Sequence, residues 1–292
     1  SGVTRNLPAE LPLGATFAAR GAYRLKTAMG GMMRGLWMLP LLALAACATP
    51  AERSGMLTSY EGLTPREGAA RTAVAEKRDD AALARVRRVR IEPSQLAPGP
   101  RTGWMNEAER TLLLREVDAQ VCFEVSERYA LVTEGEADAR VRTVVTEVRP
   151  TGRVGSALSA ASSFFIPGPI GLRVPGGLGG LSAESEMLDA SGRQLAAMTW
   201  SRSATAVGTD NPSLSRIGDA LQFAEPFGDT AAAVMTPRSM KPPGPAKPDP
   251  CAEYGPRIRP EGFLARFATG LYVPQMSRAR AAEKSGAAEA KP

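Results

Sequence analysis

Residues 184–203 read ESEMLDASGRQLAAMTWSRS, and this stretch predicts a β-hairpin. Residues 184–188 and 194–203 have the composition of two strands, and Asp189-Ala190-Ser191-Gly192 between them has the residues of a tight turn. The glycine is placed to accept a left-handed backbone conformation, which other residues adopt at a cost. An antiparallel pair is therefore the expected centre of the fold.

Two more strands and a helix are predicted on the N-terminal side of the hairpin. Residues 139–148 (ARVRTVVTEV) are rich in β-branched residues and alternate in polarity, as a strand does. Val89 and Ile91 alternate with charged residues, which indicates a half-buried strand that ends at Pro93. Between these strands, Asn106 is placed to cap a helix together with Glu109. The apolar face of that helix comprises Leu114, Val117, Val121, Val125 and Tyr129.

A second helix is expected after the hairpin. Asn211-Pro212 is suited to start it, and Pro226 is expected to interrupt or kink it before residues 231–235. Its apolar positions are Leu214, Ile217 and Leu221. The order strand, helix, strand, hairpin, helix predicts a single α+β domain. In it, the two helices pack on one face of a mainly antiparallel sheet.

Composition divides the chain around this domain. Residues 1–28 precede the first methionine and are expected to be an upstream or disordered segment outside the fold. Residues 47–80 are polar and indicate a tether, and residues 81–236 form the α+β domain with a glycine-rich insert at 152–182. Residues 237–292 are expected to be a proline-rich linker and tail, extended where its prolines lie and disordered at its end.

Residues 29–46 are typical of a bacterial lipoprotein signal peptide. The apolar segment 35–43 (GLWMLPLLA) follows a positive start and is too short to span a bilayer of ~30 Å. Leu44, Ala45 and Ala46 are the residues that signal peptidase recognition requires before Cys47. The Cys47 thiol is therefore the predicted lipidation site.

Lipidation of Cys47 predicts where the protein resides. Palmitate and further acyl chains on one cysteine hold a protein stably on a membrane. Ala48 stands where sorted lipoproteins retained in the inner membrane would have Asp. We therefore expect a protein anchored in the outer membrane that faces the periplasm.

The charge of the chain argues against a nucleic-acid partner. The net charge is +6, but residues 1–46 hold five basic residues and one acidic residue, so the remainder carries only about +2. The densest cluster, Arg85 to Arg90, alternates with valines and indicates the solvated face of a strand. The expected partners are the membrane, through the lipid, and another envelope protein.

A motif shortly after Cys47 resembles a known family. Residues 54–60 (SGMLTSY) are similar to the opening Ser-Gly-Phe-Leu and Tyr of the bacterial lipoproteins grouped as domain of unknown function 3313, with Met56 in place of Phe. The resemblance continues through residues 137–141, 189–192 and 218–220 and covers residues 47–235. It implies an envelope lipoprotein without an established activity.

The two remaining cysteines, Cys122 and Cys251, form an even pair for an oxidising compartment. A disulfide between them is the favoured interpretation, and the alternative is a buried Cys122 with a free surface thiol at Cys251. Neither cysteine has partners at metal-ligand spacing, and the chain has no histidine. We expect no metal and no cofactor beyond the covalent lipid on Cys47.

The absence of histidine excludes Ser-His-Asp and Cys-His catalysis. Carboxylate pairs drawn from Asp138, Glu184, Glu186 and Asp189 are conceivable, but their positions beside turns or on polar strand faces favour solvated surface. The leading expectation is a non-catalytic binding or accessory module, not an enzyme. A carboxylate-dependent hydrolase is an alternative.

The glycine-rich insert is the other candidate for function. It contains the apolar residues Phe164, Phe165, Ile166, Ile170 and Leu172. The favoured interpretation is a loop that caps the open face of the sheet. The alternative is a contact with lipid or an apolar partner, and this makes a self-assembling or membrane-inserting component a further hypothesis. The apolar residues within 262–276 are expected to pack back on the core.

Overall fold

The computed structural model describes residues 49–67, 71–153, 155–156, 171–172, 178–205, 207–208 and 210–277. These residues belong to one compact unit, Ala46–Pro292. The signal residues 44–46, Cys47, Phe164, Phe165, Ile166 and Ile170 lie outside the described residues, and of Leu172 only the backbone pairing is described. The expectations for residues 1–28 and 278–292 likewise fall outside them.

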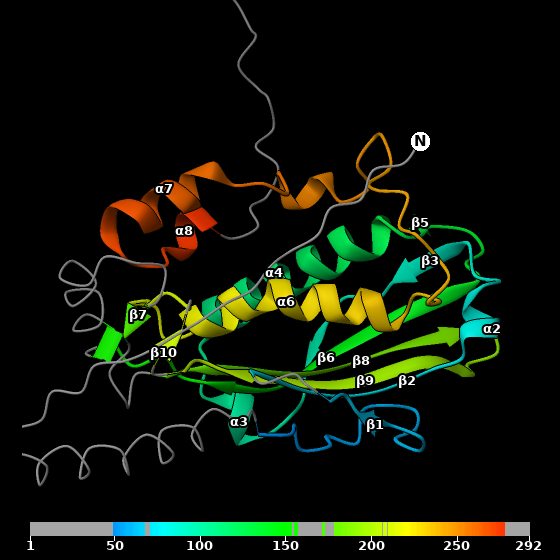
Figure 1. The fold of residues 1–292 in the computed structure, drawn as a ribbon, viewed down its shortest axis with the longest axis horizontal. Coiled ribbons are helices and arrows are strands. Elements are labelled where there is room, and N and C mark those ends of the chain that lie inside the picture. Colours follow the sequence, from blue (N-terminus) through cyan, green and yellow to red (C-terminus); the bar gives the residue numbers. More distant parts are fainter. Residues whose placement is uncertain are drawn as a thin grey trace, which may run out of the picture. The chain divides into compact units, whose positions relative to one another are not determined.

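An eight-stranded mixed sheet carries the fold (Figure 1). The strand order is β1-β2-β9-β8-β6-β3-β5, and β4 also pairs with β6. The strands are β1 (Thr64–Pro65), β2 (Thr72–Arg78), β3 (Arg88–Ile91), β4 (Gln95–Leu96), β5 (Ala130–Leu131), β6 (Ala139–Arg149), β8 (Gly180–Asp189) and β9 (Gln194–Ser203). A separate antiparallel pair joins β7 (Gly171–Leu172) to β10 (Val207–Gly208).

The strand directions bear out a mainly antiparallel sheet. The long strands β2, β9, β8 and β6 lie side by side in this order, and each runs antiparallel to the next. Strand β3 runs parallel to both β5 and β6. The predicted hairpin is confirmed, with Met187 opposite Ala196 and a turn closed by Gly192 N–H donating to the Asp189 carbonyl at 2.9 Å. Gly192 has φ of 85°, the left-handed conformation expected from the sequence.

Two long helices, α4 (Glu107–Ser126) and α6 (Gly218–Val234), lie on one face of the sheet, as predicted (Figure 1). The predicted cap of α4 is confirmed: the Glu109 N–H donates to Asn106 Oδ1 at 2.8 Å, and the Asn106 N–H donates to Glu109 Oε2 at 3.0 Å. The helices approach closely at Gly228, where a Cβ atom would lie 2.9 Å from the Gln120 backbone. A side chain larger than hydrogen at this position would therefore separate them.

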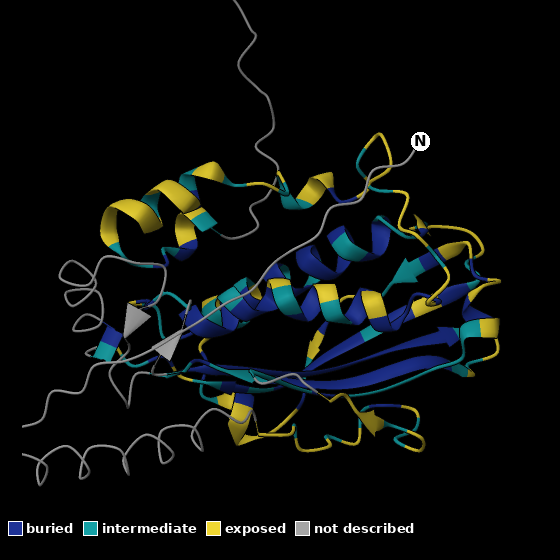
Figure 2. Ribbon diagram, viewed as in Figure 1, coloured by how far each residue is buried: buried dark blue, intermediate teal, exposed yellow. Residues whose placement is uncertain are grey.

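The main core lies between these helices and the sheet. Trp200 of β9 and Phe227 of α6 meet edge to face, with ring centroids 5.6 Å apart, and both are fully buried. Figure 2 shows the central strands as the most continuously buried elements. Among the described residues, the helices fall short of the length and apolarity that crossing a membrane requires.

The second helix differs from its predicted bounds. It begins at Gly218 rather than near Asn211-Pro212, and it continues through Pro226 without interruption. The residues before it are held in other contacts: the Asn211 N–H donates to Gln222 Oε1 at 3.1 Å, and the Pro212 carbonyl accepts from the Tyr272 N–H at 2.9 Å. These contacts explain the later start.

The boundary of the folded unit also differs, because residues 47–80 are not a free tether. All seven residues of β2 pair with β9, which places β2 inside the main sheet. Its sequence, TAVAEKR, has Val74 as the one large aliphatic residue, so its alternation is too weak to reveal the strand. Strand β2 therefore forms because it pairs with β9, and not because its own sequence has a strong strand pattern.

The chain after α6 forms what we call the C-terminal arm, residues 237–277. Residues 237–260 are largely extended, as their prolines predict, and they are followed by α7 (Pro260–Thr269) and α8 (Pro274–Ser277). The remaining short elements are α2 (Asp80–Leu83), α3 (Pro100–Gly103) and the 3-10 turn η2 (Ala252–Tyr254). The arm packs on α4 through a small cluster that includes Phe123 and Cys251.

Candidate functional site

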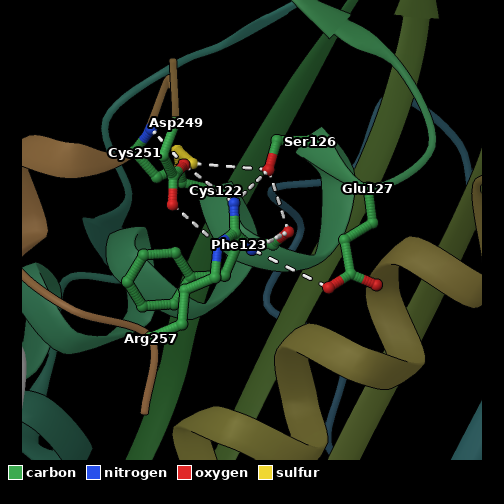
Figure 3. Close-up of a disulfide and its surroundings, with 7 residues drawn as sticks. All are labelled: Cys122, Phe123, Ser126, Glu127, Asp249, Cys251 and Arg257. Carbon is green, nitrogen blue, oxygen red and sulfur yellow. Dashed lines mark hydrogen bonds and ion pairs between the residues drawn. A yellow bond between two sulfur atoms is a disulfide. The ribbon is translucent and has the colours of Figure 1, made fainter. Parts of the chain in front are cut away.

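A disulfide between Cys122 of α4 and Cys251 fastens the C-terminal arm to the domain (Figure 3). The two Cα atoms are 5.9 Å apart, and Cys251 is fully buried. This is the pairing that the sequence favours over a free surface thiol. It places part of the arm over α4 on the side away from the sheet.

The guanidinium group of Arg257 reinforces this attachment (Figure 3). It donates to both carboxylate oxygens of Asp249, at 2.8 and 2.9 Å, and to the Phe123 carbonyl at 2.7 Å. It also donates to Ser126 Oγ at 2.8 Å, and its Cζ atom lies 4.8 Å from the centroid of the Phe123 ring. The middle of the arm, just before α7, is thus held by covalent, ionic and stacking contacts on the end of α4.

A cleft of about 610 Å³ lies between α4, α6 and the C-terminal arm. Acidic side chains of α4, its C-terminal end and α6 line it, namely Glu116, Glu124, Glu127, Glu225 and Asp229. Arginines of the arm also line it, namely Arg257, Arg259 and Arg266, and two of them pair with these acids: Arg259 with Glu116 at 3.5 Å and Arg257 with Glu127 at 3.8 Å. We call the surroundings of Asp229 the acidic part of the cleft and those of Arg259 its basic part. The cleft therefore presents both signs of charge to whatever enters it.

The acidic part is crowded with like charge. Burial, together with the neighbouring carboxylates of Glu124 and Glu225, raises the pKa of Asp229 to about 6. Arg128 compensates only in part, since its guanidinium forms an ion pair with Glu124 at 3.0 Å. A positively charged group entering the cleft would relieve this repulsion.

We expect Asp229→Asn to stabilise the protein at neutral pH. The folded-state pKa of Asp229 lies above its ordinary value of 3.8, so the folded state loses stability as pH rises through the interval from about 4 to about 6. The substitution should raise the free energy of unfolding by about 1 kcal/mol near pH 7.5, a value reduced for the partial exposure of the group. Urea titrations near pH 4 should show little difference between variant and wild type. A gain of equal size at both pH values would contradict the assignment.

The basic part contains an incompletely paired guanidinium group. The Arg259 side chain is only 8% exposed, and its Nη1 atom lies 3.5 Å from Glu116 Oε1 and donates to the Ser277 carbonyl at 3.1 Å. Its Nε and Nη2 atoms are buried and have no hydrogen-bond partner within the described part of the chain. An acceptor bound in the cleft could satisfy them, because buried N–H groups are costly to leave unpaired.

A second polar centre lies on the face of the sheet opposite the two helices. In β8, Leu181, Ala183 and Met187 belong to the main core, so the alternate residues Glu184 and Glu186 point to the other face. Both glutamates are fully buried, which corrects the expectation that they are solvated surface. Figure 1 shows the N-terminal segment and β1 running along this face.

The opening motif covers Glu184. The carboxyl group of Glu184 accepts hydrogen bonds from the Ser54 N–H at 3.0 Å, from Ser54 Oγ and from Tyr60 Oη at 2.7 Å. The Tyr60 hydroxyl in turn accepts from the Gly55 N–H at 2.9 Å. The motif is therefore a latch, residues 54–60, that closes over the polar face of the sheet.

Glu186 holds the other half of the latch. It accepts from the Thr58 N–H at 2.9 Å and from Gln194 Nε2 at 2.6 Å, and it forms an ion pair with Arg142. The Arg142 guanidinium also donates to the Met56 carbonyl at 2.7 Å. These carboxyl groups are occupied by the protein's own donors, so their evident role is to bind the latch.

Asp138 and Asp189 do not join this centre. The pKa of Asp138 is lowered because its carboxylate accepts from the backbone N–H groups of Arg88 and Arg87. Hydrogen bonds from Ser191, with further ones from Arg193, lower the pKa of Asp189 to about 2. In its charged form Asp189 stabilises the hairpin turn, and Asp138 binds backbone N–H groups at the start of β3.

Sequence reasoning missed Asp219 and the cleft. Asp219 is fully buried at the start of α6, where its carboxylate accepts the Gly179 N–H at 2.8 Å. The cleft residues come from three separated segments, and only the clustering of arginines at 257, 259 and 266 gives a local signal. In the described ranges, no group of three or more acidic or cysteine side chains is arranged to hold a metal ion.

The sheet, the two helices on one face and the latch on the other define an α+β protein built around a mixed sheet. A family model described as "Protein of unknown function (DUF3313)" matches residues 52–231, and the chain belongs to this family. The match includes the latch, the main sheet and most of α6, and it ends before the C-terminal arm. No curated protein matches the chain.

The chain also has distant similarity to solved structures, with TM-scores below 0.5. The PelC dodecamer from Paraburkholderia phytofirmans matches with 10% identity and a TM-score of 0.36, covering 57% of this chain and 99% of that chain. A DUF4136 family protein from Bacteroides thetaiotaomicron VPI-5482 matches with 8% identity and a TM-score of 0.33, with the same coverage.

Proposed function

We propose that this chain is a lipid-anchored cell-envelope protein whose domain is a non-catalytic binding module. The observation that carries the proposal is the cleft, where carboxylates crowd around Asp229 while the Nε and Nη2 atoms of Arg259 lack an acceptor in the described chain. Such a site gains from a partner that brings a cationic group to one part and an acceptor to the other. A polypeptide segment of another envelope protein has this chemistry.

The cleft should therefore give position-specific crosslinks in intact cells. We expect a photoreactive amino acid at Glu225, which is exposed and lines the cleft, to form a protein adduct of defined mass. The matched control is the same substitution at Glu107, an exposed residue of α4 outside the cleft. Asp229→Lys should abolish the adduct by reversing the charge. Identical adducts from both positions, or none from Glu225, would refute the binding site.

The anchor rests on the signal before Cys47. Because the latch begins at Ser54, only six residues separate it from the lipidated position, and the chain from Cys47 to Ser54 spans at most about 25 Å. A domain attached in this way stays next to the membrane that holds its lipid. The proposed location is the periplasmic side of the outer membrane.

We expect radioactive palmitate to label the wild-type protein and not Cys47→Ala. The variant should therefore lack the acyl chains that hold the wild-type protein stably on the membrane. The double variant Cys122→Ala/Cys251→Ala is the matched control and should keep its label. Label that persists in Cys47→Ala would show that the lipid, if any, is carried elsewhere.

One observation favours a carboxylate-dependent hydrolase as a second candidate. Asp229 has a pKa near neutrality beside the carboxyl group of Glu124, which is a condition for general acid catalysis. A wild-type activity on chromogenic esters or glycosides that Asp229→Asn abolishes would support this candidate. Absence of that activity in the wild type would reject the hydrolase and favour the binding module.

A further inference from the structure

The C-terminal arm carries most of the large apolar side chains that the described chain exposes. Of six such residues, five lie between positions 258 and 276, and the sixth is Leu214. The five are Ile258, Phe263, Leu264, Phe267 and Met276. Exposed apolar residues gathered in one segment mark a contact surface, whereas the same residues scattered singly would not.

Helix α7 exposes three of these residues, and one of them, Phe263, also lines the cleft. Phe263, Leu264 and Phe267 share one stripe of the helix and are 60%, 62% and 84% exposed. Gly262 is the one buried residue of α7, and a Cβ atom there would lie 2.6 Å from Ser277 Oγ of α8. The helix therefore packs inward through its smallest residue. The expectation that the apolar residues within 262–276 pack on the core is wrong for Phe263, Leu264 and Phe267, as Figure 2 also shows for α7, whereas Tyr272 is buried in the main core.

This exposed face has a fixed attachment to the domain. The disulfide and the Arg257 contacts hold the arm just before α7, and the Tyr272 N–H bonds to the Pro212 carbonyl just after it. Because α7 is held on both sides, its apolar stripe stays exposed to solvent in the folded protein.

The charge around the stripe indicates what covers it. Arg266 is exposed on the same helix, with its Cζ atom 5.6 Å from the centroid of the Phe263 ring. The same helix also carries Glu261, and the sequence after residue 277 has four basic residues and two acidic ones, namely Arg278, Arg280, Lys284 and Lys291 against Glu283 and Glu289. Positive charge beside an apolar stripe complements anionic lipid headgroups, and it would repel the same face of a second copy.

We propose that α7 is a membrane-contact helix. Phe263, Leu264 and Phe267 enter the interface of a bilayer that contains anionic phospholipid, and Arg266 meets the headgroups. At ten residues the helix is about 15 Å long, so it lies in the interface and does not span it. The physiological relevance rests on the proposed anchor, which keeps the domain beside a membrane.

Vesicle sedimentation tests this contact independently of the anchor. The protein used is the unlipidated chain from Ala48 to Pro292, which contains every described residue. It should bind vesicles of phosphatidylethanolamine and phosphatidylglycerol. The double variant Leu264→Ser/Phe267→Ser should reduce the partition coefficient at least about tenfold. Arg266→Gln should reduce it about fivefold on these vesicles and little on phosphatidylcholine.

Leu214→Ser is the matched control, since Leu214 is exposed but lies outside the arm. It should bind like the wild type, and all variants should unfold at the wild-type temperature. Wild-type protein that ignores vesicles, or a double variant that binds equally well, would overturn the proposal. A concentration-dependent dimer that the double variant loses would assign the face to a second copy instead. The protein in this assay lacks Cys47, so a negative result here would contradict only the membrane-contact helix. A negative palmitate labelling would contradict only the anchor.

Discussion

Glu184→Ala is expected to destabilise the domain by about 3 kcal/mol or more. The substitution removes the acceptor of Ser54 N–H, Ser54 Oγ and Tyr60 Oη, and it leaves a cavity where a fully buried side chain stood. The latch should then detach and expose its own buried residue Leu57. Urea unfolding measures the loss of stability, and hydrogen exchange of residues 51–60 measures the detachment.

Two variants calibrate this result. Tyr60→Phe removes one of the three donors to Glu184 and should cost about 1 kcal/mol. Glu61→Ala changes an exposed carboxylate in the same segment and should change stability by less than about 0.5 kcal/mol. If Glu184→Ala unfolds at the same urea concentration as Glu61→Ala, the latch contributes nothing to the stability of the fold.

Features with local causes were predictable from the sequence. The hairpin follows from the Asp189 to Gly192 turn between two strand-like runs, and the start of α4 follows from the reciprocal bonds of Asn106 and Glu109. Each depends on residues at most a few positions apart. The two long helices on one face of the sheet were predictable because their apolar residues recur at helical spacing.

Features that depend on distant partners were not predictable. The alternation in β8 places Glu184 on the polar face of the strand, but the residue that binds its carboxyl group, Ser54, lies 130 positions earlier in the chain. No strand was predicted around Val74, because β2 forms through its pairing with β9 and its own residues alternate only weakly in polarity. The stripe of α7 was amphipathic in the sequence, yet periodicity does not say whether an apolar face meets the core or the outside.

The second large effect is expected from the disulfide. Cys122→Ala/Cys251→Ala should lower the free energy of unfolding by about 3 kcal/mol, because the bond links residues 129 positions apart and restricts the unfolded chain. Alanine suits both sites, since Cys251 is fully buried and a hydroxyl there would need a partner. Dithiothreitol should reproduce the loss in the wild type and have no effect on the double variant. A wild-type unfolding midpoint that is the same with and without the reductant would contradict this prediction.

Hydrogen exchange separates the two ways in which the bond can act. If it only restricts the unfolded chain, amides in β8 and β9 lose protection, and amides of the C-terminal arm change no more than these do. The other contacts between the arm and α4 include Arg115 with the Glu253 carbonyl at 2.6 Å, Arg259 with Glu116 at 3.5 Å and the Phe123 and Tyr254 rings. None of them is covalent, so the arm should open locally once the disulfide is absent. We therefore expect residues 251–272 to lose more protection than the central strands. Arg257→Met in the oxidised protein should produce a smaller change confined to the arm, because the bond still tethers it.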